Sequence, residues 1–204
     1  MGHDKETREK LIESAKAEFM EKGYNKASLR SICANAGVTT GALYFFFDDK
    51  ADLFKEVTGG VFEGVLSILQ QHFDNDRQIL SDPDYVGDDN DDHSELAQQL
   101  IHYIYSNYDE VILMLKRSQG SEYEDAVDRI VDMTETASFE MMVNMASRIG
   151  KKGVNKYMLH LVTHLMVDSF VHLITHEPDE QKALQSIKKV FKMTTHNWTD
   201  TVLD

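Results

Sequence analysis

The stretch SLRSICANAGVTTGALYFFFDDKADLF, residues 28–54, predicts two short helices separated by a tight turn. Ser28 is a good cap for a first helix of about two turns, whose apolar residues recur at helical spacing. Gly37 ends that helix, because glycine adopts the left-handed backbone of such a turn without a steric penalty. Thr39 can cap the second helix, which runs to about residue 46. Two short helices around a glycine turn are typical of a helix-turn-helix.

In a helix-turn-helix the second helix enters the major groove of DNA. Hydroxyls at its start suit phosphates or base edges, a glycine there lets the backbone approach closely, and exposed aromatic rings suit a phosphate or a thymine methyl. A lysine at the start of the next helix suits a phosphate. The predicted DNA-binding residues are Ser28, Arg30, Thr39, Thr40, Gly41, Tyr44, Phe45 and Lys50. We expect Leu43 and Phe47, four residues apart, to pack inward instead.

The charge of the chain is unevenly distributed. The net charge of the 204 residues is -14, which taken alone argues against binding to phosphates. Residues 1–58 hold 9 basic and 10 acidic side chains, whereas residues 59–204 hold 12 and 25. The acidity therefore belongs to the second part, and the helix-turn-helix carries a modest basic surface.

The rest of the chain reads as helices, with few breakers. An amphipathic helix over about residues 6–22 ends at Gly23, and a helix from residue 48 or 49 to about Phe73 contains three glycines, at which we hypothesise a soft point (Gly59, Gly60 and Gly64). Residues 74–94 hold a dense acidic run whose like charges repel each other and resist packing, which predicts a mobile loop. A calcium loop is the alternative, but the spacing does not match its ligand pattern and no glutamate closes it. Further helices are expected over 94–107, 109–118, 122–150, 153–176 and 180–202. The predicted fold is all-α, with a three-helix DNA-binding domain at 1–50 and a larger helical bundle for effector binding and dimerisation at 51–204.

The segment from Ser28 to Phe54 resembles the DNA-binding signature of TetR-type transcriptional regulators. That signature has a Thr/Ser start, an Ile-Ala-x-x-Ala-Gly-Val turn and a Leu-Tyr-x-x-Phe-x-x-Lys-x-x-Leu run. The matching residues are Ser28, Ile32, Ala36, Gly37, Val38, Leu43, Tyr44, Phe47, Lys50 and Leu53, with Ala15, Phe19, Gly23 and Tyr24 upstream. The resemblance covers about the first 60 residues. It implies a homodimer whose last two helices form a four-helix bundle with their mates, a ligand cavity in the larger domain, and release of a palindromic DNA operator when a small-molecule effector binds.

The chain departs from this signature at three positions. Phe46 stands where the family often has a hydrogen-bond donor, and Asp48 stands where a basic residue is usual. Both changes remove contacts to phosphate, so we expect weaker or more salt-sensitive DNA binding. Cys33 replaces a usual alanine, and its helical position predicts a small buried residue rather than a redox sensor.

The helix expected over residues 153–176 is apolar around most of its circumference, which predicts burial on more than one side. We therefore expect an isologous dimer through this helix and the last one, which adds Trp198 among its apolar residues. Histidines follow each other at four-residue steps on the same helix: His160, His164, His172 and His176, with Asp168 between them. A metal-binding protein or metal sensor built on this ladder is the alternative function. HLVTH lacks the glutamate of a metalloprotease motif.

Candidate residues for the effector cavity are Met and aromatic side chains of the larger domain, with one histidine: Tyr103, Met114, Phe139, Met142, Met145 and His164. No spacing typical of catalytic groups is found, so we expect no enzymatic activity and no cofactor or metal. No membrane partner is expected, because the N-terminus lacks a signal peptide and no apolar run approaches a membrane span. The expected location is the cytoplasm.

Overall fold

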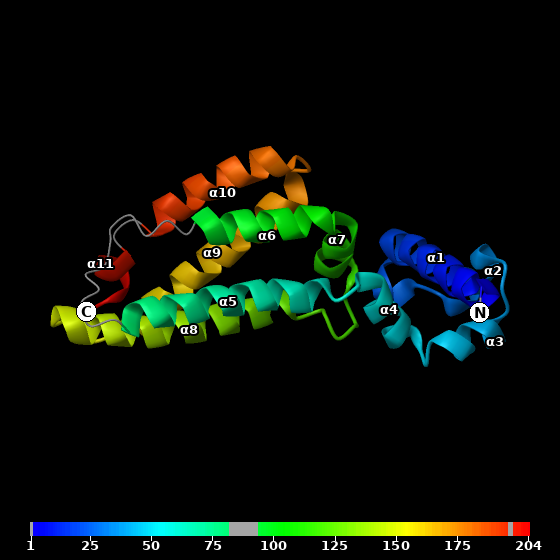
Figure 1. Cartoon of the computed structure of the whole chain (residues 1–204), viewed down its shortest axis with the longest axis horizontal. Helices are drawn as coiled ribbons and strands as arrows, with labels where there is room; N and C mark the ends of the chain where they lie inside the picture. The colour runs from blue at the N-terminus through cyan, green and yellow to red at the C-terminus, as the bar shows by residue number, and fades with distance from the viewer. Residues whose placement is uncertain (1, 82–93, 196–197) are drawn as a thin grey trace. The chain divides into compact units, whose positions relative to one another are not determined.

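The computed structural model covers the whole chain and describes residues 2–81, 94–195 and 198–204. The chain is 84% helical, and the described residues form no strand, which confirms the predicted all-α class. Figure 1 labels the helices: α1 (Gly2–Lys26), α2 (Leu29–Ala36), α3 (Thr40–Phe46), α4 (Lys50–Thr58), α5 (Val61–Ser81), α6 (Ser94–Ser106), α7 (Tyr108–Arg117), α8 (Ala126–Ile149), α9 (Lys156–His176), α10 (Glu180–Thr195) and α11 (Trp198–Val202).

The helices form two compact units. Unit 1 comprises Met1–Glu63 and Asn107–Ala126, and unit 2 comprises Gly64–Ser106 and Val127–Asp204. Unit 1 therefore contains α7, from the middle of the chain, beside the four N-terminal helices. The predicted division after residue 50 concerns function, between DNA binding and effector binding, and it stays a prediction.

The core of unit 1 forms around α1. Leu11, Ala15 and Phe19 lie at helical spacing on one face of α1 and are fully buried. The ring of Phe19 meets that of Phe54 from α4 edge-on, at 4.9 Å between centroids. Helix α7 is held to α1 by Lys16, whose ammonium lies 3.1 Å from an Asp109 oxygen and 2.8 Å from a Glu110 oxygen. Burial acts to lower the pKa of Lys16, but these two carboxylates outweigh it and raise the pKa.

Unit 2 has two apolar clusters. Ala97 and Ile101 from α6 pack with Ala183, Ile187 and Phe191 from α10. A second cluster joins α8 and α9 to the C-terminal residues (Met142, Ala146, Leu159, Val202 and Leu203). There the backbone of residues 202–204 pairs with the loop before α9, through an isolated antiparallel bridge between Val154 and Leu203. This pairing satisfies backbone groups that the buried C-terminal residues would otherwise leave without partners.

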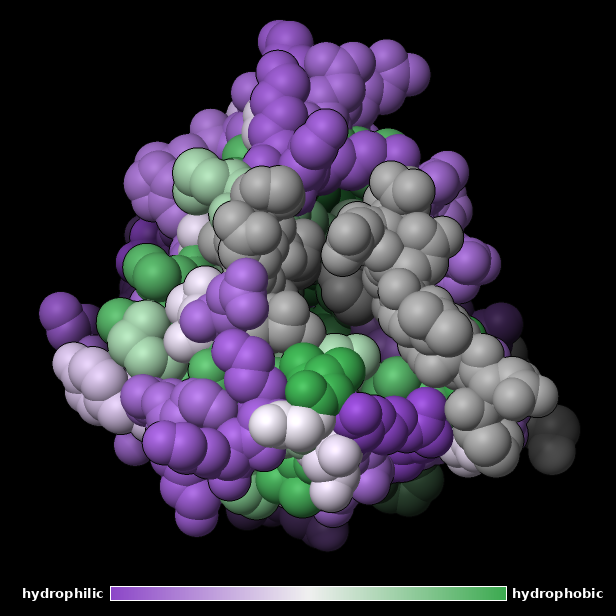
Figure 2. Space-filling view, turned by 90° about the vertical axis from the view of Figure 1, so that its left-hand side faces the viewer, coloured by the Kyte–Doolittle hydropathy of each residue, from purple (hydrophilic) through white to green (hydrophobic). Residues whose placement is uncertain are grey.

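The surface of unit 2 around the C-terminus is mainly hydrophilic. Figure 2 shows charged and polar residues over most of this face, with apolar residues in small scattered groups. Such scattered groups are usual on folded proteins.

The predicted helix from residue 48 or 49 to Phe73 is wrong. Gly59 and Gly60, at φ 61° and 70°, separate α4 from α5, so these two glycines end a helix rather than soften one. Only Gly64 lies inside a helix, and a Cβ there would fall 1.9 Å from the Tyr103 hydroxyl. Close packing of α6 therefore explains Gly64.

The loop predicted over 74–94 begins later than expected. Helix α5 continues to Ser81, where polar pairs such as Gln70–Asp74 and Arg77–Asp74 support it at helical spacing. The acidic run itself lies outside the described residues. The other boundaries are predicted within a few residues. Helix α1 begins at Gly2 rather than about residue 6, and Gly23, its predicted end, interrupts it with a non-helical backbone at φ 74° and ψ 162°. Helix α8 begins at Ala126 rather than 122, and α10 ends at Thr195.

Helix α9 is long and apolar enough, by length and composition alone, to span a membrane, and 22% of its most apolar window is buried. Its buried residues are Leu159, Val162, Thr163 and Ile174. Three apolar side chains on it are exposed at steps of four residues: Tyr157 at 73%, Leu161 at 39% and Leu165 at 52%. Residues four apart share a helix face, so these side chains form an exposed apolar stripe along α9.

Candidate nucleic-acid interface

The turn between α2 and α3 has the predicted geometry. The Ser28 hydroxyl accepts the Ser31 N–H at 3.4 Å and so caps α2. Gly37 closes α2 in the left-handed region, at φ 69° and ψ 28°, and its N–H donates to the Ala34 carbonyl. A Cβ at Gly37 would meet nothing within 4 Å, so the glycine is needed for its backbone conformation and not for space. The helix-turn-helix predicted from residues 28–46 is confirmed.

Helix α3 separates core side chains from exposed ones. Leu43 and Phe47 are buried, as predicted. Thr39 caps the helix, accepting the Ala42 N–H at 3.2 Å, and it is exposed together with Thr40 and Gly41. A Cβ at Gly41 would meet only the Thr39 hydroxyl, at 3.8 Å. No neighbour in the fold therefore demands a glycine at position 41, although glycine costs a helix about 1 kcal/mol relative to alanine.

The exposed face of α3 carries two large aromatic rings. Tyr44 is 58% exposed and Phe45 is 76% exposed, whereas Phe46 is half-buried. The Phe45 ring meets the Phe46 ring edge-on, at 4.9 Å between centroids. The predicted DNA-binding residues Thr39, Thr40, Gly41, Tyr44 and Phe45 thus all lie on one short helix or its cap, and all are accessible.

Lys50 has a structural role that the sequence did not indicate. Its ammonium donates to the Tyr24 carbonyl at 2.9 Å and, at longer distances, to the carbonyls of Asn25 and Ala27. The same nitrogen lies 4.6 Å from the centroid of the Tyr24 ring. Lys50 therefore binds the carbonyls at the end of α1, and its predicted contact to phosphate stays a prediction.

Glu18 is a buried carboxylate that sequence reasoning missed. Glu18 is only 3% exposed. One of its carboxylate oxygens accepts the Ser28 N–H at 3.1 Å, and the Lys22 ammonium donates to both oxygens, at 2.8 and 2.9 Å. Burial acts to raise the pKa of Glu18, but the bonds from Lys22 and Ser28 outweigh it and leave the pKa below its ordinary value. Glu18 on α1 thereby holds the backbone of Ser28, the residue that caps α2. A glutamate four residues before a lysine on a helix was the only available signal, and that pattern is common on solvated faces.

The charges around α3 are mixed. Asp49 caps α4 by accepting the Asp52 N–H at 2.9 Å, and Asp52 accepts the Asp48 N–H at 3.1 Å. The side chains of Asp48 and Asp49 are exposed, and so is that of Arg30 on α2. Phosphates near the C-terminal end of α3 would therefore meet carboxylates, whereas the α2 side offers a cation.

Cys33 is buried, as predicted. Burial raises the pKa of its thiol, so the reactive thiolate is disfavoured. This agrees with a core role for Cys33.

The structure divides the six candidate cavity residues between the two units. Phe139, Met142 and Met145 come together in the α8–α9 cluster of unit 2, whereas Met114 is buried in α7 of unit 1. Tyr103 and His164 are half-buried in unit 2. The assignment of these six residues to an effector cavity therefore stays a prediction.

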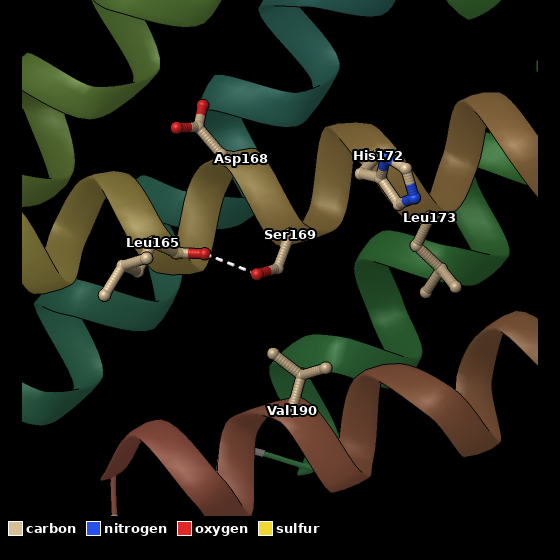
Figure 3. A pocket seen from close by; sticks show the side chains of 6 residues that line it. All are labelled: Leu165, Asp168, Ser169, His172, Leu173 and Val190. Carbon is tan, nitrogen blue, oxygen red and sulfur yellow. Dashed lines mark hydrogen bonds between the residues drawn. The ribbon is translucent and has the colours of Figure 1, made fainter.

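A pocket of about 360 Å³ lies between α9 and α10 and is lined by none of those six residues. Its lining is Leu165, Asp168, Ser169, His172, Leu173 and Val190. Figure 3 shows Leu173 and Val190 pointing into the space between the two helices, whereas Asp168 points away from α10. The Ser169 hydroxyl donates to the Leu165 carbonyl at 2.5 Å, so it is already bonded within α9.

The histidine ladder on α9 pairs locally. His160 lies 2.7 Å from a Glu135 oxygen and its ring meets that of His164 edge-on, while the rings of His172 and His176 stack at 4.2 Å. Within residues 2–81, 94–195 and 198–204, no group of three or more His, Cys, Asp or Glu side chains is arranged to hold a metal ion. Nothing in this arrangement favours the metal-sensor alternative.

Residues 11–57 match the family described as "Bacterial regulatory proteins, tetR family". The chain is 46% identical over 54 residues to the HTH-type transcriptional repressor BepR of Brucella suis biovar 1 (strain 1330), which is 26% of each chain. It is 38% identical over 58 residues to the HTH-type transcriptional regulator TtgR of Pseudomonas putida, 28% of each chain. The matches thus span about a quarter of the length of these curated relatives. The residues matched by the family, 11–57, contain the whole helix-turn-helix.

The fold as a whole is similar to that of solved regulators. A transcriptional regulator from Aquifex aeolicus VF5 superposes with a TM-score of 0.59 at 17% identity, over 92% of this chain and 98% of that one. NalD of Pseudomonas aeruginosa superposes with a TM-score of 0.54 at 18% identity, over 98% of both chains. At such identities the likeness extends to the fold alone. Residues 11–57 thus match the tetR family of bacterial regulatory proteins in sequence, and the chain as a whole is similar to these solved regulators in fold.

Proposed function

We propose that the chain is a dimeric transcriptional repressor of the cytoplasm that binds a palindromic DNA operator and is released from it by a small-molecule effector. The observation that carries this proposal is the exposed face of α3. It presents Thr40, Gly41, Tyr44 and Phe45 beside a correctly closed Gly37 turn. That arrangement is suited to docking a helix in the major groove.

Contacts to the sugar-phosphate backbone of DNA are assigned to side chains around α3. Arg30 is exposed on α2, and Ser28 and Thr39 cap α2 and α3. Each hydroxyl already accepts one backbone N–H and can still donate to a phosphate oxygen. Lys50 is kept in this set, with its ammonium shared between the α1 carbonyls and the DNA backbone. Only Arg30 and Lys50 among these residues carry positive charge, so binding should be weaker than for proteins with many basic contacts. Because fewer counterions are released, affinity should also fall less steeply with salt, which reverses the greater salt sensitivity expected from the sequence.

The proposed dimer forms through α9 and α10. Support comes from the apolar stripe Tyr157, Leu161 and Leu165 on α9 and from Met193 on α10, which is 74% exposed. A second copy of the same helices would cover these side chains in an isologous interface. A membrane is a poor partner for α9, because Asp168 and the four histidines along its length would be costly in hydrocarbon.

Effector binding is assigned to unit 2, without a defined set of contacts. The Met and Phe side chains of the α8–α9 cluster can repack around an apolar molecule. The two α3 helices of a dimer must lie roughly 34–36 Å apart to enter successive major grooves. An effector that binds more tightly to a dimer with another spacing would lower the affinity for DNA by the same factor by which DNA lowers the affinity for the effector.

Selection of bound duplexes from a random pool tests this function. The expected result is a palindromic consensus whose affinity falls with salt, together with a dimer in light scattering at micromolar concentration. Arg30→Ala should weaken binding and reduce the salt dependence by about one unit of slope per bound phosphate. Lys151→Ala, an exposed cation of unit 2, is the matched control and should leave binding unchanged. Recovery of no consensus, or a monomer at that concentration, would overturn the proposal.

A further inference from the structure

The ring of Phe45 is not needed by the fold. At 76%, Phe45 has the highest exposure among the large hydrophobic side chains whose burial the structure describes, and the ring that it meets is that of its neighbour Phe46. Leu43 and Phe47, on the opposite face of the same turn, fill the core. A phenylalanine held in water by a rigid two-helix frame has most of its apolar surface still to bury on a partner.

Helix α3 lacks the side chains that read most base edges. Its residues, TGALYFF, include no arginine or lysine for guanine, no asparagine or glutamine for adenine, and no carboxylate for cytosine. What it presents is hydroxyls and aromatic rings. The apolar group that a base pair displays in the major groove is the C5-methyl of thymine, and it is the natural partner for a ring without polar atoms.

The neighbouring charges favour a base edge over the DNA backbone as the partner of this ring. Asp48 and Asp49 follow the rings in the chain, and both side chains are exposed. Carboxylates repel phosphates, so a contact between the Phe45 ring and the sugar-phosphate backbone is disfavoured at this end of α3. The groove floor, where the methyl group lies, does not carry that charge.

Building on the proposed operator binding, we propose that Phe45 recognises the C5-methyl group of a pyrimidine in each operator half-site. The contact detects the methyl group and not the hydrogen-bonding edge of the base. Thymine and 5-methylcytosine both carry this group, whereas uracil and cytosine lack it. The interface therefore reads cytosine methylation at that position as well as sequence.

The test uses the wild-type protein and the selected operator, with each thymine of a half-site replaced in turn by deoxyuridine. Removing one buried methyl should weaken binding about fourfold, and removing both related methyls about 14-fold, from ~0.8 kcal/mol per methyl group and 1.4 kcal/mol per tenfold change. The loss should occur at one thymine per half-site. Replacing that thymine by cytosine and then by 5-methylcytosine should recover about fourfold per half-site.

The second part of the test repeats the binding measurements with the variant Phe45→Ala. Because the side chain is exposed, the variant should keep the thermal stability of the wild type. It should bind the thymine and uracil operators equally, whereas Ile79→Ala, an exposed apolar residue of α5, should keep the full discrimination. Tight binding to a consensus with no sensitivity to uracil at any position, or discrimination that survives Phe45→Ala, would overturn this inference while leaving the proposed function intact. Failure to select any consensus would overturn both.

Discussion

Replacing Glu18 by alanine is expected to lower the free energy of unfolding by about 1.5–3 kcal/mol, because it removes a buried carboxylate that joins α1 to α2. The bond from the Ser28 N–H, at 3.1 Å, ends on a charged acceptor and is worth about 1.5–3 kcal/mol. The pair with Lys22 adds little to this, because the lysine side chain is 39% exposed and screened by water.

Two variants separate these contributions. Glu18→Gln keeps an oxygen for the Ser28 N–H and loses the charge, so it should lose less stability than Glu18→Ala. Glu13→Ala, at an exposed position on the same helix, is the matched control and should change stability by less than about 0.5 kcal/mol. The measurement is urea unfolding followed by circular dichroism.

The pH dependence gives an independent readout. The folded-state pKa of Glu18 lies below its unfolded value, so its contribution is fully present above the unfolded pKa and is lost as the pH falls through the folded pKa. Glu18→Ala should therefore lose less stability than the wild type between neutral pH and that acidic range. A Glu18→Ala variant within about 0.5 kcal/mol of the wild type at neutral pH would refute the reasoning.

Three further outcomes are expected. Lys50→Met should destabilise the chain by about 1–3 kcal/mol in urea unfolding, because the α1 carbonyls and the Tyr24 ring lose their cation, and an unchanged midpoint would contradict this. Asp48→Lys should tighten operator binding and raise its salt dependence by about one unit of slope per subunit, measured by fluorescence anisotropy across salt concentrations. Gly64→Ala should lower the melting temperature, since overpacking against Tyr103 costs about 1–3 kcal/mol and exceeds the gain in helix propensity; relief by a second change, Tyr103→Leu, is the control.

The residues 28–49 determined their own local structure. Ser28, Gly37, Thr39 and Asp49 end or begin helices where the sequence predicts, because a cap needs only its own side chain and the next turn of backbone. Exposure of Tyr44 and burial of Leu43 follow from helical periodicity. The resemblance of residues 28–54 to the tetR signature could be recognised from the same stretch, since a helix-turn-helix depends on short-range spacing.

Tertiary structure decided the features that depend on distant partners. The Lys50 ammonium turns to carbonyls 23 to 26 positions earlier in the chain, and Glu18 is buried because Ser28 and Lys22 satisfy it. Helix α7 belongs to unit 1 through Lys16, which lies 94 positions from Glu110. The break at Gly59 and Gly60 was missed because apolar periodicity continues across it. Local sequence determines where a helix can begin or end, whereas packing and long-range electrostatics decide which neighbour each side chain meets, and no spacing along the chain specifies that neighbour.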